Sequence, residues 1–137
     1  MLKRFVLLVG LLAIGTTLFA ADAPKPKKYN HVVYLTGGVT EEEANAMRAV
    51  GGDYGLQLSF AVEGKPTAAG EVKVIIKDLS GETVVDGVAD GPLFFVKVVG
   101  GRYTVILDRG GDVKEKTFDL IGRRFGQFSF DWTDTKN

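Results

Sequence analysis

His31 is the one histidine of the chain and therefore the first candidate for a general base near neutral pH. A Ser-His-Asp arrangement would pair it with Ser59, Ser80 or Ser129. Ser59 and Ser129 occupy the polar positions of alternating strand patterns, and Ser80 precedes Gly81 in a turn signal. We therefore expect no hydrolytic site on His31, and the sequence assigns no catalytic residue.

Asp108 and Asp112 stand on either side of the glycine pair 110–111. Carboxylates suit Ca²⁺, but this ion takes roughly six to eight oxygen ligands. A hairpin with polar ends is the simpler interpretation. The chain has no cysteine, and the second glycine pair, 100–101, is followed by no helix that could bind a phosphate. The sequence assigns no metal ligand and no cofactor.

The segment 93–99 is apolar on both faces, with Leu93 and Phe95 on one side. A two-layer sandwich buries only one face of each sheet. The surplus apolar residues therefore need a second cover, or they form a patch for a partner. That possible partner patch consists of Phe94, Val96, Ile75 and Ile106.

A helix expected over 41–50 is the available cover. Thr40 followed by Glu43 is a capping box, and the acids at 41–43 suit the positive end of a helix. Met47 lies in the apolar stripe of this helix, together with Ala44 and Val50. We expect Met47 to contact at least one residue of the patch. We expect the glycines at 51–52 to end the helix in a left-handed conformation.

The other elements are expected to be strands, separated by glycine-rich turns. The pair Gly100-Gly101 predicts a two-residue hairpin. In the last strand Phe128, Phe130 and Trp132 alternate with polar residues, so all three should face the core. No internal repeat is convincing. The expected strands span 31–35, 56–62, 72–76, 83–88, 93–99, 102–108, 113–120 and 127–132.

The N-terminus has the three parts of a secretory signal. Lys3 and Arg4 precede the apolar run 5–18, and Ala20 and Ala21 are small residues suited to cleavage. The run is about fourteen residues, short of the roughly twenty that a spanning helix needs. We expect a signal peptide at 1–20, cleaved after Ala20 or Ala21, a periplasmic or secreted product, and no stable membrane anchor.

Charge excludes one class of partner. Lys and Arg number 17, as do Asp and Glu, so no broad basic surface is expected and nucleic acid is not a partner. Lys25, Lys27 and Lys28 lie in segment 21–30 with two prolines. They could touch an anionic membrane, but a solvated linker is the simpler interpretation. The domain is then expected over 31–134, including helix 41–50.

Residues 64–107 carry a resemblance to a known family. The opening Gly64-Lys65-Pro66, the turn Asp90-Gly91, the aromatic strand at Phe95 and the run Gly101-Arg102-Tyr103-Thr104-Val105 resemble carboxypeptidase regulatory-like domains. The stretch 37–132 is also similar to a group of small secreted proteins of Gram-negative bacteria. The resemblance implies a transthyretin-like sandwich and an accessory or binding role.

We therefore expect a mainly β protein, an antiparallel transthyretin-like or Ig-like β-sandwich with one short N-terminal helix. The expected function is non-enzymatic binding of a protein or cell-envelope component. Two alternatives stay open: a hydrolase or other enzyme with unrecognised chemistry, and a structural subunit that associates through sheet edges. The sequence leaves the oligomeric state open.

Overall fold

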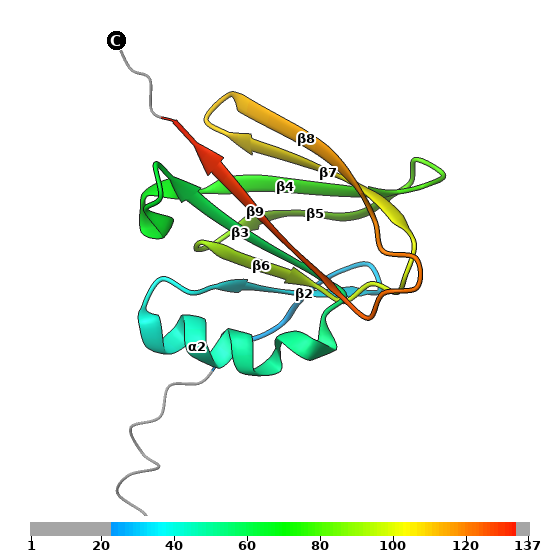
Figure 1. Ribbon diagram of the computed structural model, residues 1–137, viewed down its shortest axis with the longest axis horizontal. Coiled ribbons are helices and arrows are strands. Elements are labelled where there is room, and N and C mark those ends of the chain that lie inside the picture. Colours follow the sequence, from blue (N-terminus) through cyan, green and yellow to red (C-terminus); the bar gives the residue numbers. More distant parts are fainter. Residues whose placement is uncertain (1–22, 134–137) are drawn as a thin grey trace, which may run out of the picture.

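A computed structural model describes residues 23–133, which form a sandwich of two sheets with one α-helix on its outside (Figure 1). The prediction of a mainly β sandwich with one short helix is confirmed. No helix within residues 23–133 is long and apolar enough to cross a membrane. The expected signal peptide and its cleavage point lie outside the described residues.

The first sheet, sheet A, has the strand order β1-β2-β6-β3-β9, and sheet B has the order β5-β4-β7-β8. Sheet A contains β1 (Lys27–Tyr29), β2 (Val32–Gly37), β6 (Leu93–Val96), β3 (Leu56–Val62) and β9 (Gly126–Trp132). Sheet B contains β5 (Thr83–Ala89), β4 (Val72–Asp78), β7 (Arg102–Arg109) and β8 (Asp112–Asp119). The α-helix is α2 (Glu41–Val50), and the short 3-10 helices are η1 (Gly51–Asp53) and η2 (Pro66–Ala69).

Trp132 is a central residue of the core between the sheets, and only 1% of it is exposed. Its ring packs against Phe60, with the ring centroids 6.0 Å apart. The indole Nε1 donates a hydrogen bond to the carbonyl oxygen of Asp112 at 3.3 Å, so the one polar atom of the side chain is satisfied. The prediction that Trp132 belongs to the core is confirmed.

Helix α2 begins and ends where the sequence predicts. Thr40 Oγ1 accepts the backbone N–H of Glu43 at 3.1 Å, and Glu43 Oε1 accepts the N–H of Gly38 at 2.7 Å. The expected left-handed ending is wrong, because Gly51 has a right-handed φ of −61°. A Cβ there would come within 3.2 Å of the Gln57 amide, so this glycine allows a close approach.

Helix α2 covers the outer face of sheet A, but the residues of β6 on that face are not the predicted ones. Met47 is buried in a cluster with Leu35, Leu93 and Phe95, not with the residues of the predicted patch. Pairing decides which face of β6 lies inside: Phe94 stands opposite Leu58, whose side chain faces the core. Both faces of β6 are thus buried, one by sheet B and the other by the helix.

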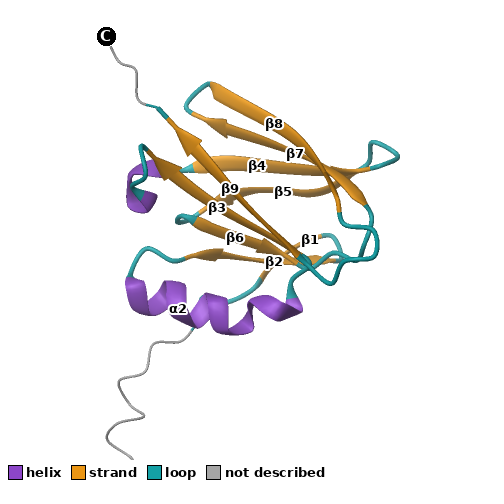
Figure 2. Ribbon diagram, viewed as in Figure 1, coloured by secondary structure: helices purple, strands orange, loops and turns teal. Residues whose placement is uncertain are grey.

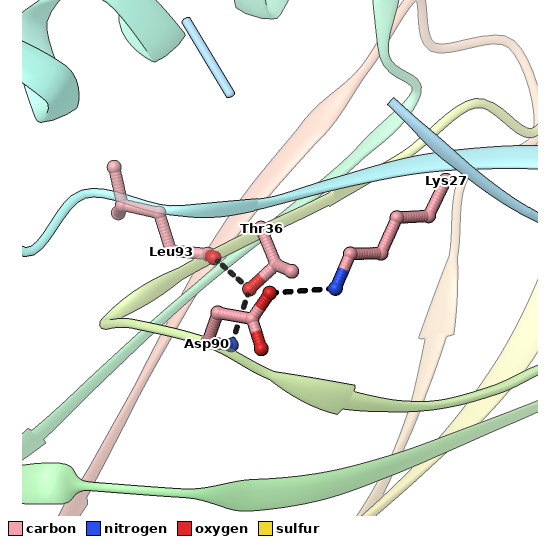
Figure 3. Close-up of polar contacts among 4 residues, drawn as sticks. All are labelled: Lys27, Thr36, Asp90 and Leu93. Carbon is pink, nitrogen blue, oxygen red and sulfur yellow. Dashed lines mark hydrogen bonds and ion pairs between the residues drawn. The ribbon is translucent and has the colours of Figure 1, made fainter. Parts of the chain in front are cut away.

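The predicted linker contains a strand. Lys27–Tyr29 pairs with β2 as β1, and Lys27 Nζ lies 2.7 Å from Asp90 Oδ2 (Figure 3). This hydrogen bond raises the pKa of Lys27 above its usual value. Thr36, beside them, donates to the Leu93 carbonyl and accepts the Asp90 N–H, both at 2.9 Å. Strand β1 forms through its pairing with β2 and its contact with Asp90. Its own sequence, two lysines beside a proline, therefore gives no strand signal.

The two glycine pairs behave differently. Gly110 and Gly111 have positive φ values of 59° and 96° and form the hairpin between β7 and β8. The hairpin predicted at Gly100-Gly101 is wrong, since β6 and β7 belong to different sheets. The chain crosses between the sheets there, and neither of these two glycines has a positive φ. One strand pair, β3 with β9, is parallel rather than antiparallel.

Candidate functional site

Helix α2 covers only part of the outer face of sheet A (Figure 2). Its buried residues Ala44 and Met47 pack over β2 and β6, against Leu35, Leu93 and Phe95. Strands β3 and β9 lie beyond the helix, and their outward side chains are mostly polar. This arrangement leaves a groove with α2 as its wall and the two strands as its floor.

The groove has a volume of about 470 Å³. Arg48 contributes to its wall, Ser59 and Ser129 to its floor, and η2 bounds it at one end. A smaller hollow of about 220 Å³ shares these three residues and continues along the same strands to Gln57 and Gln127. The polar floor therefore extends along most of the paired length of β3 and β9.

The floor consists of matched polar side chains. Ser59 Oγ and Ser129 Oγ are 2.9 Å apart, and Gln127 Nε2 donates to Gln57 Oε1 at 3.1 Å. The parallel register places like residues opposite each other, because segments 57–60 and 127–130 share the pattern Gln-x-Ser-Phe. Our sequence analysis missed this short pattern, which is the signal that could have indicated the pairing.

Arg48 has no ion pair within the part of the chain that the structure describes. It is exposed, lies in the last turn of α2 and borders both hollows. A free guanidinium can bind a carboxylate through two parallel hydrogen bonds. The groove can therefore receive a polar side chain, or an acidic one next to Arg48, with hydroxyl and amide groups below it. Glu41 and Asp131 also line the groove and disfavour a second acidic group near them.

The backbone of β9 forms a second feature of this region. Among the described strands, β9 pairs only with β3. Gly126 N–H donates to the Gly55 carbonyl, and the Trp132 carbonyl accepts from Glu63 N–H, both at 2.9 Å. Alternate residues of a strand point to the same side in a parallel ladder. The N–H and C=O groups of Gln127, Ser129 and Asp131 consequently point away from β3, toward the open edge.

A hollow of about 360 Å³ lies beside this open edge. Ser129, Phe130 and Asp131 border it on the β9 side, and Lys114, Glu115 and Lys116 of β8 border it on the other. Both lysines stand opposite core residues of β7, whereas Glu115 stands opposite Ile106 on the outer face of sheet B, so the positive charge is confined to the inner side of this space.

The other sheet edges are protected against strand pairing. On β8, Lys114 and Lys116 stand opposite the buried residues Leu107 and Val105, so both lysines point to the inner face. Inward-pointing charges on an edge strand disfavour the addition of another strand. Strand β5 contacts β1 and β2 and has an irregular register with β4, and β1 is only three residues long with two lysines. Strand β9, with seven residues and one charge, has none of these devices.

The predicted partner patch does not form one surface. Phe94 and Val96 are each 0% exposed and lie in the core between the sheets, so they are corrected to core residues. Ile75 and Ile106 are half-buried and stand opposite each other on the outer face of sheet B. Asp86 is opposite Ile75 on the other side, which leaves only a small apolar area within a charged row.

The structure also places the residues considered for catalysis and metal binding. His31 lies exposed beside Asn30 in the turn between β1 and β2, and Ser59 is hydrogen bonded to Ser129. Asp108 Oδ1 accepts the N–H of Gly111 at 2.8 Å within the hairpin. Among residues 23–133, no group of three or more His, Asp or Glu side chains could hold a metal ion.

Comparison with known proteins adds no assignment. No protein-family model matches the chain, and no curated protein matches it. The resemblance of residues 64–107 to carboxypeptidase regulatory-like domains stays a prediction.

Proposed function

We propose that this protein is a non-enzymatic binding module that accepts an extended segment of a partner protein as an added strand along β9. The observation that supports this most directly is the edge itself. Three residues, Gln127, Ser129 and Asp131, direct backbone donors and acceptors into open space beside a regular strand. Addition of a strand to such an edge supplies main-chain hydrogen bonds, each worth about 0.5–1.5 kcal/mol net.

The surroundings of β9 favour acidic side chains on the inward side of an added strand, where Lys114 and Lys116 point, and not on the outward side, where Glu115 and Asp131 lie. Alternate side chains of an added strand would face the hollow beside Lys114 and Lys116. A carboxylate at such a position gains an ion pair of about 0.2–1 kcal/mol if the site stays wet. The main-chain bonds supply the affinity, and these two lysines select the side chain.

We place this binding outside the cytoplasm, since the charged start, apolar run and small residues of segment 1–21 favour export. A hydrolase is less well supported, because the two serines of the groove floor bond to each other. His31 lies in the exposed turn between β1 and β2 and does not line the groove. A purely structural role would make a second copy of this chain the partner. Peptide binding by a monomeric protein distinguishes the binding role from this structural role.

The test selects linear peptides from a random phage-displayed library on the immobilised protein. Synthetic versions of the selected peptides are then added to the protein, and amide hydrogen exchange is measured by NMR. We expect slower exchange at the N–H groups of Gln127, Ser129 and Asp131, and an excess of acidic residues in the peptides. Sedimentation of the protein alone, without peptide, should show a monomer.

Ser129→Pro is the decisive variant, because it removes an outward N–H and leaves the main-chain bonds to β3 in place; of the side-chain contacts it loses the hydroxyl bond to Ser59. We expect it to abolish peptide binding, while Ser129→Thr binds as the unchanged protein does. Arg48→Glu should have little effect. Binding that depends on Arg48 but not on Ser129 would place the ligand in the groove and contradict the proposal. A stable dimer through β9 would make self-assembly the function instead.

A further inference from the structure

Three loops at one end of the sandwich expose large aliphatic side chains. Leu79, Val99 and Ile121 are 75%, 80% and 67% exposed, and they come from the β4–β5, β6–β7 and β8–β9 connections. Leu79 and Ile121 border one hollow of about 380 Å³, together with Tyr103. These loops lie at the right-hand end of the molecule in Figure 1. We call Leu79, Val99 and Ile121 the aliphatic tip.

The loops of the aliphatic tip are held in place by specific contacts. Leu120 N–H donates to the Gly101 carbonyl at 2.7 Å, which joins the β6–β7 and β8–β9 loops. Tyr103 Oη donates to the Val99 carbonyl at 2.7 Å. The Asp119 carboxylate accepts the Ile121 N–H at 3.0 Å. The exposed side chains are therefore presented by an ordered surface, and their exposure is a feature of the fold.

Positive charge is interleaved with these apolar residues. Arg123 and Arg124 follow Ile121 in the β8–β9 loop and precede Phe125, which is 38% exposed. Lys97 also lies in the β6–β7 connection, but its Nζ is 5.4 Å from the centre of the Tyr54 ring, which packs in the cluster beneath α2. Arg123 and Arg124 are therefore the basic side chains next to the aliphatic tip.

Two acidic side chains at this end, Asp119 and Asp78, are already engaged. Asp119 is paired with Arg102 at 3.2 Å and also holds the Ile121 N–H. Asp78 Oδ1 accepts hydrogen bonds from Ser80 and Glu82 within the β4–β5 turn. Glu82 is exposed, and the β4–β5 turn that carries Leu79 contains no basic residue. The 97–102 and 119–125 loops still carry four basic residues against one acid.

We propose that the aliphatic tip docks on an anionic lipid surface. Aliphatic side chains on loop tips can insert at the boundary between headgroups and acyl chains, and neighbouring arginines can bind lipid phosphates. The alternation in Ile121-Gly-Arg-Arg-Phe125 provides both in one loop. The contact is peripheral, and it is independent of the strand addition proposed for β9.

Sedimentation with vesicles tests this proposal on the mature protein. Vesicles of phosphatidylglycerol and phosphatidylcholine should bind it at low salt, and pure phosphatidylcholine vesicles should bind far less. Raising the salt concentration should weaken binding, because the attraction to anionic headgroups is screened. No sedimentation with the anionic vesicles, or equal binding to both compositions, would overturn the proposal. If the aliphatic tip binds a protein instead of lipid, the protein should not sediment with the anionic vesicles.

Variants locate the contact. Ile121→Asp, and separately the pair Arg123→Glu and Arg124→Glu, should each weaken vesicle binding about tenfold or more. Val113→Asp is the matched control, because Val113 is 55% exposed and lies near the Gly110-Gly111 hairpin at the other end of β8. It should bind as the unchanged protein does.

Equal loss in the Val113→Asp control, or full binding by Ile121→Asp, would contradict the assignment. All of these positions are exposed, and circular dichroism confirms that each variant is folded. Ser129→Pro should leave vesicle binding unchanged, which separates the aliphatic tip from the β9 edge.

Discussion

Strands β8 and β9 are edge strands on the same side of the sandwich, yet they treat their edges in opposite ways. The inner face of β8 carries Lys114 and Lys116, whereas that of β9 carries Phe130 and Trp132. Lys114 Nζ lies 5.5 Å from the centre of the Trp132 ring, so the two strands meet there. Both strands lie at a sheet edge, so their place in the fold does not explain why their inner faces differ. One edge is protected by charge, while the other keeps a regular backbone available for pairing.

The open edge is nevertheless part of a rigid strand. Inward aromatic residues anchor β9 at both ends, since Phe128 stacks on Phe118 with centroids 3.7 Å apart and Trp132 packs on Phe60. A preformed acceptor strand loses little conformational entropy when a partner binds. The open edge of β9 therefore does not come from loose packing of that strand.

The largest expected effect is the loss of the β9 anchor. Trp132→Ala removes a fully buried indole and should cost about 3–5 kcal/mol of the free energy of unfolding, with a fall in Tm of about 10 °C or more. Thermal unfolding followed by circular dichroism measures this. Asp131→Ala, on the outward side of β9, is the control and should cost much less. An unchanged Tm for Trp132→Ala would show that β9 is not held by its inner face.

The second prediction compares the covered and open parts of the outer face of sheet A. Met47→Asp places a charge beneath α2 and should cost about 2–5 kcal/mol. Ser129→Asp places the same charge on the open floor and should cost about 1 kcal/mol or less. Urea unfolding of both variants gives the two values. Equal costs would mean that β9 is as covered as β6, and the comparison of edges would fail.

The third prediction removes the protection of β8. Lys116→Val replaces an inward charge on this edge with a β-branched apolar residue, so the variant should self-associate. Sedimentation velocity at increasing concentration should show dimers or larger species. Lys73→Val adds the same residue on the outer face of the central strand β4 and should stay monomeric. If both variants stay monomeric, the inward lysines are not what protects β8.

The smallest expected effect concerns pH at the end of β8. The N–H of Ile121 and the Arg102 guanidinium hold the pKa of Asp119 below its usual value. The stabilisation is therefore present above the pKa of the unfolded state, and it is lost as the pH falls through the lower folded value, below about pH 4. The NMR shift of the Ile121 amide should titrate in this acid range. The Asp119→Asn variant should lack that titration, and the same titration in the variant would exclude Asp119 as its source.

Local signals in the sequence predicted local structure well. The capping box at Thr40 and Glu43 placed the start of α2, and the glycines at 51–52 placed its end. Period-2 alternation placed Trp132 in the core. Such signals depend on neighbours in sequence, so they can be read without knowledge of the fold.

Features that depend on distant pairing were not predictable in the same way. The face of β6 that lies inside is decided by its register with β3. Strand β1 exists because β2 and Asp90 stabilise it. The groove and the open edge of β9 arise from a parallel pairing across about half of the chain, which glycine turns and alternation do not reveal. The repeated Gln-x-Ser-Phe pattern is the one signal of this region that the sequence offers, and our sequence analysis missed it. The inward direction of Lys114 and Lys116 follows from the register of β8 with β7.

Amide hydrogen exchange in the free protein tests the central claim about β9 most directly. Because only alternate residues bond to β3, the amides of Phe128, Phe130 and Trp132 should exchange slowly. Those of Gln127, Ser129 and Asp131 should exchange much faster within the same strand. Slow exchange at all six amides would show that a partner or a second copy already covers the edge, and it would contradict the account of β9 as a free acceptor strand.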